Sequence, residues 1–459
     1  MAITTTNPTL PAGFTAAQAR DPNYFPGFGI AIPLGIQHVL AMFVSNITPA
    51  IIVAGAAGFG FGSPDPSALI YMIQMSMLFA GIATLMQSVG FGPIGARLPL
   101  VQGTSFAYIS VMVPIVAGKG VPAMAALMTG ALACGIFHAI ASRLVGRIRF
   151  ALPPMVTGLV VLMIGLSLMK IAVEYAAGGP TKLGTPEFGA WQSWLLAGTV
   201  VIATFGLKFF ARGIWSSASV LIGLIIGYLL AAAMGRVSLA PVSGSGWFML
   251  PTPFHFGLSF STSAIIGFIL TGFVSSIETI GDVEAICEGT AARPATDDEL
   301  IGAVGADGVG TALAAIFGAM PNTTFSQNVG LIAITGVMSR HIVTLGAALL
   351  VISGLIPKVG AAITTIPIEV LGGGVIVMFG MVASSALSML ARVEWSQRNM
   401  LIFGTALSLS LGLQLEPAAL AYMAETPRIL LTSGVLPAAL IALVLNLVLP
   451  RHIGEEAAA

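Results

Sequence analysis

The sequence has few charged residues. Only 8% of its 459 residues are Asp, Glu, Lys or Arg, whereas 56% are hydrophobic. Soluble domains carry roughly 25% charged residues, so this chain cannot cover a water-exposed surface with polar side chains. The low charge excludes a predominantly soluble protein and indicates one that lies mostly in a lipid bilayer. Because a span needs about 20 apolar residues, the length allows roughly a dozen or more spans joined by short loops.

Residue patterns that carry chemistry are also scarce. The two cysteines, Cys134 and Cys287, lie in apolar runs and form neither a disulfide framework nor a metal-ligand spacing. The net charge is zero and no basic patch stands out, which argues against a nucleic-acid partner. No nucleophile with a base, metal-ligand cluster or Gly-rich phosphate loop is present. We therefore expect neither an enzyme nor a protein that binds a cofactor or metal ion. A receptor is also disfavoured, because the sequence contains no soluble sensor domain.

The apolar runs predict an all-α integral membrane protein with fourteen membrane-spanning segments. They lie between an N-terminal tail of residues 1–27, in which we see no cleaved signal peptide, and a C-terminal tail of residues 451–459. The predicted segments are 29–55, 68–88, 98–116, 121–142, 154–174, 191–210, 216–234, 262–284, 299–319, 323–340, 342–358, 367–390, 398–414 and 429–449. Lys and Arg are enriched in the loops that face the cytoplasm if the N-terminus is cytoplasmic. An even number of spans then returns the C-terminus to the cytoplasm.

Two of these segments are interrupted at matching places. The polar stretch Ser243–Pro253 divides the chain into two sets of seven spans, and the third span of each set contains Pro followed by Thr, Ser and Gln. An odd-numbered unit repeated once must be inverted in the membrane, and paired broken helices are typical of transporter binding sites. We expect the extended pieces to pair as two short strands, with half-helices starting at Ser105 and Asn328 and directing partial positive charge at a ligand. The alternative is that both are kinked packing helices.

Three carboxylates stand out as lying well inside predicted spans, where a charged side chain costs at least about 2.5–3.5 kcal/mol. Glu278 and Asp282 are four residues apart and so share one face of a helix. Asp307 lies among small residues that would let a neighbouring helix approach closely. We interpret all three as candidate functional groups. Alternatively, Asp282 stands in water at a helix end, and Asp307 makes a purely structural polar contact.

Two further polar residues stand out. His38 follows Gln37 in the first span, where it is either a satisfied core histidine or a group that orients the face carrying Glu278. Gln327 lies at the second interruption, and a buried side-chain amide offers a donor and an acceptor together. This pair matches the adjacent N–H and C=O groups of a dioxopurine or dioxopyrimidine. A planar amide-bearing ligand therefore explains Gln327 better than lipid does, since an unpaired amide would cost about 1–3 kcal/mol.

The string Gln327-Asn-x-Gly-x-x-x-x-Thr-Gly336 resembles the signature of the nucleobase/ascorbate transporter family of nucleobase:cation symporters, in the form of its xanthine and uric acid branch. The resemblance extends over nearly the whole chain. It includes Gln37-His38, Gly103-Thr-Ser-Phe106, Glu278 with Asp282, Asp307 and Pro321-Asn-Thr-Thr.

The resemblance implies a seven-plus-seven inverted repeat with a core domain and a gate domain, the gate also forming a homodimer. It assigns residues 28–150 and 254–360 to the core, and residues 151–240 and 361–450 to the gate. Glu278, Gln327, Phe106, Ser326 and Asn328 are then the substrate-binding candidates. Asp282, Asp307 and His38 would couple protons or support the site.

The same resemblance separates the branches of the family. Uracil carriers typically have Glu at the place of Gln327, His at Asp282 and Arg at Gly336, and this chain has none of these. One departure from the xanthine/urate form is Val329, where that form usually has Asn. The sequence predicts a proton-coupled purine importer in the bacterial inner membrane that carries xanthine or uric acid by alternating access, with sodium as the other possible ion. A uracil or pyrimidine permease of the same family is the main alternative, and an anion transporter of the same architecture is more distant because the site carries carboxylates.

Overall fold

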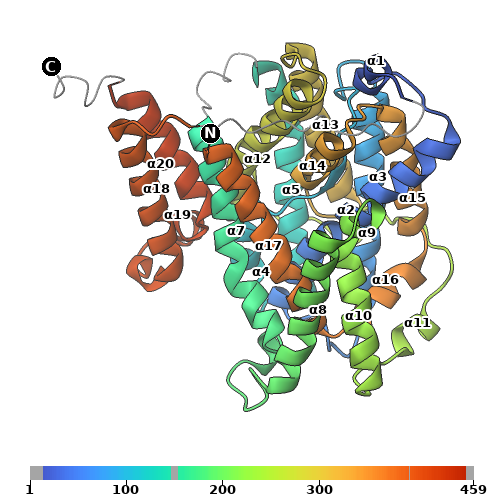
Figure 1. The fold of residues 1–459 in the computed structure, drawn as a ribbon. Coiled ribbons are helices and arrows are strands. Elements are labelled where there is room, and N and C mark those ends of the chain that lie inside the picture. Colours follow the sequence, from blue (N-terminus) through green and yellow to red (C-terminus); the bar gives the residue numbers. More distant parts are fainter. Residues whose placement is uncertain (1–13, 146–153, 392, 451–459) are drawn as a thin grey trace.

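The computed structural model describes residues 14–145, 154–391 and 393–450. Its first half contains α1 (Ala16–Arg20), α2 (Phe28–Ala57), α3 (Ser67–Val89), β1 (Gln102–Thr104), α4 (Ile109–Val116), α5 (Met124–Ala141), α7 (Pro154–Ala176), α8 (Trp191–Phe210), α9 (Ile214–Ser217), α10 (Ser219–Ala233) and α11 (Ala240–Gly244). Its second half contains α12 (Thr262–Gly289), α13 (Asp297–Ile316), β2 (Asn322–Thr324), α14 (Ser326–Thr335), α15 (Arg340–Gly354), α16 (Pro357–Thr364), α17 (Ile368–Leu390), α18 (Gln397–Leu415), α19 (Glu425–Thr432) and α20 (Val435–Val448). In Figure 1, α18, α19 and α20 stand together beside α7, and the other helices form the larger body.

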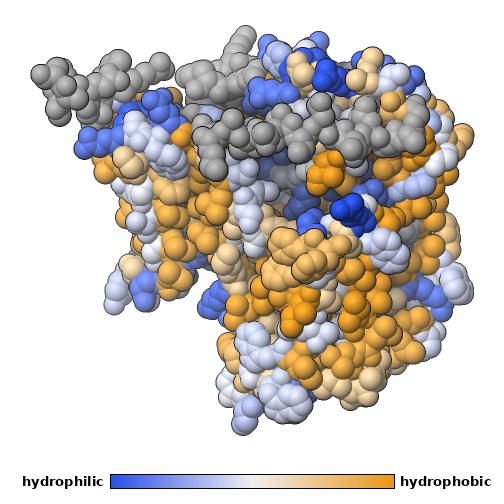
Figure 2. Space-filling view, viewed as in Figure 1, coloured by the Kyte–Doolittle hydropathy of each residue, from blue (hydrophilic) through white to orange (hydrophobic). Residues whose placement is uncertain are grey.

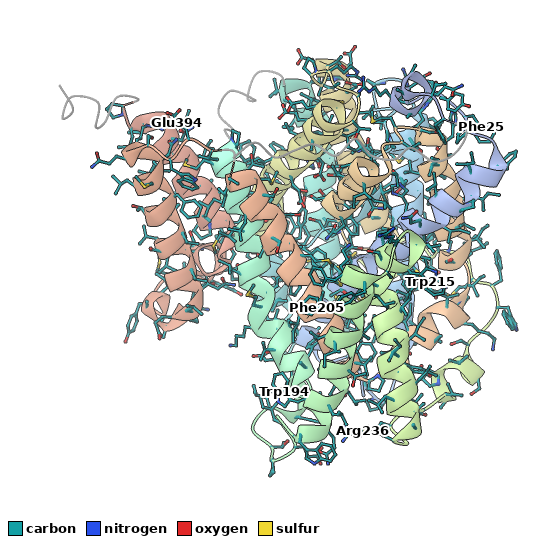
Figure 3. All side chains as sticks on the ribbon, in the orientation of Figure 1. Phe25, Trp194, Phe205, Trp215, Arg236 and Glu394 are labelled. Carbon is teal, nitrogen blue, oxygen red and sulfur yellow. The ribbon has the colours of Figure 1, made fainter. Side chains whose placement is uncertain are left out.

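The described helices include eight that are long and apolar enough to cross a membrane, or ten if each bent pair is one span. Apolar side chains cover the outer face around α8 and α10 (Figure 2). Trp194 and Phe205, both on α8, are 44% and 47% exposed (Figure 3). An apolar surface of this extent fits contact with lipid. The protein is thus an all-helical membrane protein, with one pair of short strands among the residues that the structure describes.

Some predicted segments differ in shape from the expectation. The segment 429–449 is not one straight helix, because α19 and α20 meet at an angle of 82° at Gly434, whose φ of +74° a β-carbon would disfavour. The segment 342–358 ends earlier, and the chain turns by 79° from α15 into α16. A residue with special backbone properties lies at each bend. Gly434 tolerates a positive φ, and Pro357 has no N–H to continue the preceding helix.

Helices of the two halves pack against each other in matched pairs. The contact of α5 with α13 has its counterpart in that of α3 with α15, and the contact of α5 with α12 in that of α2 with α15. Glycines permit these close approaches. A β-carbon at Gly308 would lie 2.3 Å from the backbone nitrogen of Ala139, and one at Gly35 would lie 2.8 Å from the carbonyl oxygen of Ile342. Small residues at helix crossings are the usual basis of tight packing in membranes.

The two interrupted segments meet as an antiparallel pair of strands. Gly103 of β1 lies opposite Thr323 of β2, and the amide of Ser105 donates to the carbonyl of Pro321 at 2.9 Å. Where a helix is interrupted, its backbone N–H and C=O groups lose their helical partners. In a dry interior these groups must find other hydrogen-bond partners. Side chains supply them: Thr84 accepts from the amide of Gln102, Asn46 from that of Thr104, and Thr311 from that of Asn322, at 2.9, 2.9 and 3.1 Å.

The half-helices begin at different residues from those expected. The first, α4, starts at Ile109 and not at Ser105, whose amide is still engaged in the strand pairing. The second, α14, starts at Ser326 and not at Asn328. Phe325 is the last extended residue, with φ −108° and ψ +106°, and its carbonyl already accepts from the amide of Asn328 at 2.9 Å, which closes the first turn of the helix.

Candidate functional site

A small cavity lies beside the paired strands, at the start of α14. Its volume is about 20 Å³, enough for about one water molecule. Residues of α7, α12, α14 and α17 line it, together with the strand region of each half. The lining residues are Phe106, Val161, Ile164, Glu278, Thr323, Phe325, Ser326, Gln327, Val382 and Ser385.

Glu278 and Gln327 bring a carboxylate and an amide to the same cavity. Glu278 projects from the middle of α12, and Gln327 from the first turn of α14. Both side chains are half-buried, and neither has a hydrogen-bond partner among the described residues. A buried polar group without a partner loses the free energy of its hydrogen bonds to water. These two residues therefore have free hydrogen-bonding capacity directed at whatever occupies the cavity.

An aromatic wall closes one side of this cavity. Phe106, which follows β1, is only 8% exposed, and its ring meets that of Phe379 on α17 edge to face, with centroids 5.4 Å apart. Of these two rings, only that of Phe106 lines the small cavity, which it shares with Phe325. The site thus combines a planar apolar surface with hydrogen-bonding groups, an arrangement suited to a flat heterocycle.

Asp282 lies one helical turn beyond Glu278, and its side chain is engaged by the chain break. The hydroxyl of Thr324 donates to Oδ2 of Asp282 at 2.6 Å, and the hydroxyl of Ser326 donates to Oδ1 at 2.8 Å. Only 3% of Asp282 is exposed. The carboxylate therefore ties β2 and the start of α14 to α12 and fixes the position of Ser326.

Asp307 is fully buried and accepts three hydrogen bonds. Gln102 donates to Oδ1 at 2.5 Å, Gln87 donates to the same oxygen at 3.3 Å, and Thr279 donates to Oδ2. The amide of Gln87 can only donate here, because its oxygen accepts from the backbone amide of Ala96. Asp307 therefore connects α12, α13, α3 and β1 through one carboxylate.

These partners of Asp307 were not among the sequence candidates. Gln102 lies within the first interrupted segment, so its polarity was visible, but nothing in the sequence pairs it with a residue 205 positions away. Thr279 is adjacent to Glu278, and nothing in the sequence distinguishes it from other threonines in helices. Thr323 belongs to the same cluster, since Ser275 donates to its hydroxyl at 3.0 Å.

His38 and Asn328 contact each other instead of the cavity. The amide nitrogen of Asn328 lies 3.0 Å from Nδ1 of His38 and donates to the carbonyl of His38 at 3.0 Å. Both residues are at most 5% exposed. The structure thus links His38 to the residue after Gln327, and not directly to Glu278. Its position allows it to hold the first turn of α14 against α2.

A second, wider cavity of about 570 Å³ adjoins the small one. The two share Val161, Ser326 and Ser385 in their walls. The wider cavity extends past Val329 towards Glu288, near the end of α12. On the orientation expected from the Lys and Arg distribution this is the cytoplasmic side. Val329 lines this vestibule and is not part of the small cavity.

The described residues contain no cluster of metal-binding side chains. Within residues 14–145, 154–391 and 393–450, no group of three or more His, Cys, Asp or Glu residues is arranged to hold a metal ion.

Comparison with known proteins identifies the family of the chain. A protein-family model described as the permease family matches residues 29–418. The chain belongs to this permease family. The uric acid permease PucJ of Bacillus subtilis is 35% identical to the chain, with 90% of this permease and 91% of PucJ aligned. The xanthine permease XanP of Escherichia coli strain K12 is 34% identical, with 90% of each chain aligned. Membership identifies the chain as a transporter and not an enzyme.

Solved structures with the same fold are more distant in sequence. The transmembrane domain of the cyanobacterial bicarbonate transporter BicA aligns with a TM-score of 0.56 over 91% of this permease and 98% of that domain, at 13% identity. The murine anion transporter Slc26a9 in its inward-facing state aligns with a TM-score of 0.60 over 90% of this permease and 67% of that chain, at 11% identity. At such low identities the likeness concerns the fold alone.

Proposed function

We propose that this permease imports an oxidised purine base, xanthine or uric acid, together with a proton. The observation that carries the proposal is that Glu278 and Gln327 line one cavity with their hydrogen-bonding groups unpaired by the described residues. Relatives named as xanthine and uric acid permeases, aligned over 90% or more of the chain, support the substrate class.

In the proposed complex, the amide of Gln327 pairs with adjacent N–H and C=O groups of the base. The carboxylate of Glu278 accepts from a ring N–H, and main-chain groups at Phe106 and Ser326 add further hydrogen bonds. The ring of Phe106 lies against the base. The positive end of α14 favours the electron-rich carbonyl edge of the substrate, since its first amides have no intrahelical partner.

The sizes of the two cavities support transport by alternating access. A purine does not fit in about 20 Å³, whereas the adjoining vestibule measures about 570 Å³. Substrate binding therefore requires the walls of the small cavity to separate. We assign these walls to a core domain (residues 28–150 and 254–360) and a gate domain (residues 151–240 and 361–450), which move against each other about the site. The matched helix contacts of the two halves support fourteen spans in an inverted repeat.

Proton coupling is assigned to Glu278 with Asp307. An ionised carboxylate in a dry site is costly unless it is protonated or paired. Glu278 has no partner among the described residues, so its charge must be neutralised when the site closes around a substrate. Asp307 already accepts three hydrogen bonds and holds the surrounding helices. We further propose a homodimer in the bacterial inner membrane with both termini in the cytoplasm.

Uptake into proteoliposomes tests this function. We expect saturable uptake of radiolabelled xanthine or uric acid that an inside-alkaline pH gradient drives and an uncoupler abolishes. Uptake driven by a sodium gradient at equal pH would replace the proton in this scheme. Absence of uptake for every nucleobase would reject it.

A competition series separates the alternatives. Excess unlabelled uracil should leave xanthine uptake unchanged, and complete inhibition by uracil would favour a pyrimidine permease. Bicarbonate and chloride are the controls for anion transport, because the two solved structures with this fold include a bicarbonate and an anion transporter.

A further inference from the structure

The segment from Phe14 to Pro26, here called the N-terminal arm, is folded onto the body of the permease. It contains α1, whose first turn is closed by reciprocal hydrogen bonds between Thr15 and Gln18. A helix of five residues is not stable alone in water. Ala19, on the inner face of α1, is only 1% exposed, whereas Ala17 on the same helix is exposed. Packing against the body therefore holds the arm in place.

The arm makes hydrogen bonds to the loop that follows α14 and to the first turn of α15. The amide of Met338 donates to the carbonyl of Ala19 at 2.7 Å, and the amide of Arg340 donates to the carbonyl of Pro22 at 3.0 Å. The imidazole Nε2 of His341 lies 3.2 Å from the carbonyl of Asn23. These bonds satisfy loop groups that no regular element satisfies.

Side chains reinforce the same contact. Phe14 packs against a buried cluster formed by Ala31, Val337 and Ile342. Phe25, at the other end of the arm, meets the ring of His341 edge to face, with centroids 5.7 Å apart (Figure 3). The cluster joins the arm, the beginning of α2, the loop after α14 and the start of α15.

The loop after α14 is held from its other side as well. The guanidinium of Arg340 donates to the carbonyls of Ser88 and Val89 at the end of α3, at 2.9 and 3.1 Å. Gly336, with φ +68°, ends α14 just before this loop. The segment that directly follows α14 is therefore enclosed between the arm and α3.

This enclosure matters for the substrate because α14 has only ten residues and carries Gln327 in its first turn. Bonds to Asp282 and His38 hold the first turn of α14 directly. Because a helix of this length has little stability of its own, the orientation of that turn depends as well on how the chain beyond the last turn is anchored. We propose that the N-terminal arm is a positioning element for substrate binding: it fixes the end of α14 and thereby the orientation of Gln327. The proposal rests on the proposed function for its substrate, but the anchoring itself does not.

The test compares two full-length variants, Ala19→Asp and Ala17→Asp. Both place a new carboxylate on α1, but only Ala19 faces the body, so only its substitution should release the arm. Hydrogen–deuterium exchange in nanodiscs would follow peptides that span residues 336–342. We expect the amides in this region to exchange at least about tenfold faster in Ala19→Asp than in wild type, and at the wild-type rate in Ala17→Asp. The KM for xanthine should rise severalfold in Ala19→Asp while helices remote from the arm keep their exchange rates.

Each outcome decides a separate point. Equal exchange of residues 336–342 in both variants would overturn the anchoring. Faster exchange with an unchanged KM would overturn the positioning role. Faster exchange in a protein whose wild type binds no purine would leave the anchoring in place and reject the proposed substrate instead.

Discussion

The side-chain amide of Gln37 donates a 2.7 Å hydrogen bond to the hydroxyl of Ser217, across 180 positions of sequence. The hydroxyl in turn donates to the carbonyl of Gly213, which fixes the direction of both bonds. Gln37 lies on α2, next to His38 and so next to the contact with Asn328. Ser217 ends α9, in the proposed gate domain. This bond therefore joins the two bodies whose relative movement the proposed transport cycle requires.

Removing this bond should shift the balance between the conformations of the permease. A buried hydrogen bond contributes about 1 kcal/mol, so Ser217→Ala should change the ratio of inward- to outward-facing molecules about fivefold. The rate at which a maleimide labels a cysteine placed at Gly330 in the vestibule measures this ratio, since a β-carbon there meets no other atom within 4 Å. The neighbouring substitution Ser216→Ala is the control. Equal labelling rates in all three proteins would contradict the idea.

Glu278→Gln should abolish purine uptake while the protein remains folded in the membrane. The substitution removes the negative charge that strengthens the bond to a ring N–H, replaces one acceptor oxygen with an NH2 donor, and removes the group proposed to carry the proton. Glu416→Gln is the matched control, because Glu416 is an exposed residue that lines neither cavity. Radiolabelled uptake and the melting temperature in the presence of xanthine are the measurements. Wild-type affinity in Glu278→Gln would remove this residue from the site.

Asp307→Asn should destabilise the permease more than it alters substrate recognition. An asparagine offers one acceptor oxygen where the carboxylate offers two, so its NH2 group would face either the two glutamines or Thr279, and at least one buried donor would lose its acceptor. Such a loss costs about 1–3 kcal/mol. Thermal unfolding in detergent should show a lower melting temperature than in Asp298→Asn, an exposed carboxylate on the same helix. An unchanged melting temperature would show that the three donors find other partners.

Gly308→Ala should weaken the packing of α13 against α5. The added methyl group would lie 2.3 Å from the backbone nitrogen of Ala139, and the backbone must move to admit it. Overpacking of this kind costs about 1–3 kcal/mol. Gly380→Ala on α17 introduces the same group where nothing lies within 4 Å, and its melting temperature should equal or exceed that of wild type, because alanine favours a helix more than glycine does. If both variants melt alike, the close approach is not a source of stability.

The sequence by itself indicated the membrane environment and the two chain breaks. A chain with few charges and long apolar runs cannot stay dissolved in water and inserts into a lipid bilayer. Polar residues in the middle of such runs need hydrogen-bond partners, which lipid does not offer. For the same reason Glu278 and Gln327 could be singled out as candidates before any contact was known. The signature around Gln327 pointed to the permease family for a different reason, through similarity.

Only the tertiary structure decided which polar groups are already paired. In the sequence, three polar residues look as available to a ligand as Glu278 does. In the structure each has a hydrogen-bond partner: Asp282 accepts from Thr324, Asp307 accepts from Gln102, and Asn328 contacts His38. Those partners come from segments up to 290 positions away, and no local pattern records which distant helices meet. The start of α14 at Ser326 was decided in the same way, because pairing with the other half keeps Phe325 extended. Composition determines that a group must be satisfied, whereas packing determines what satisfies it.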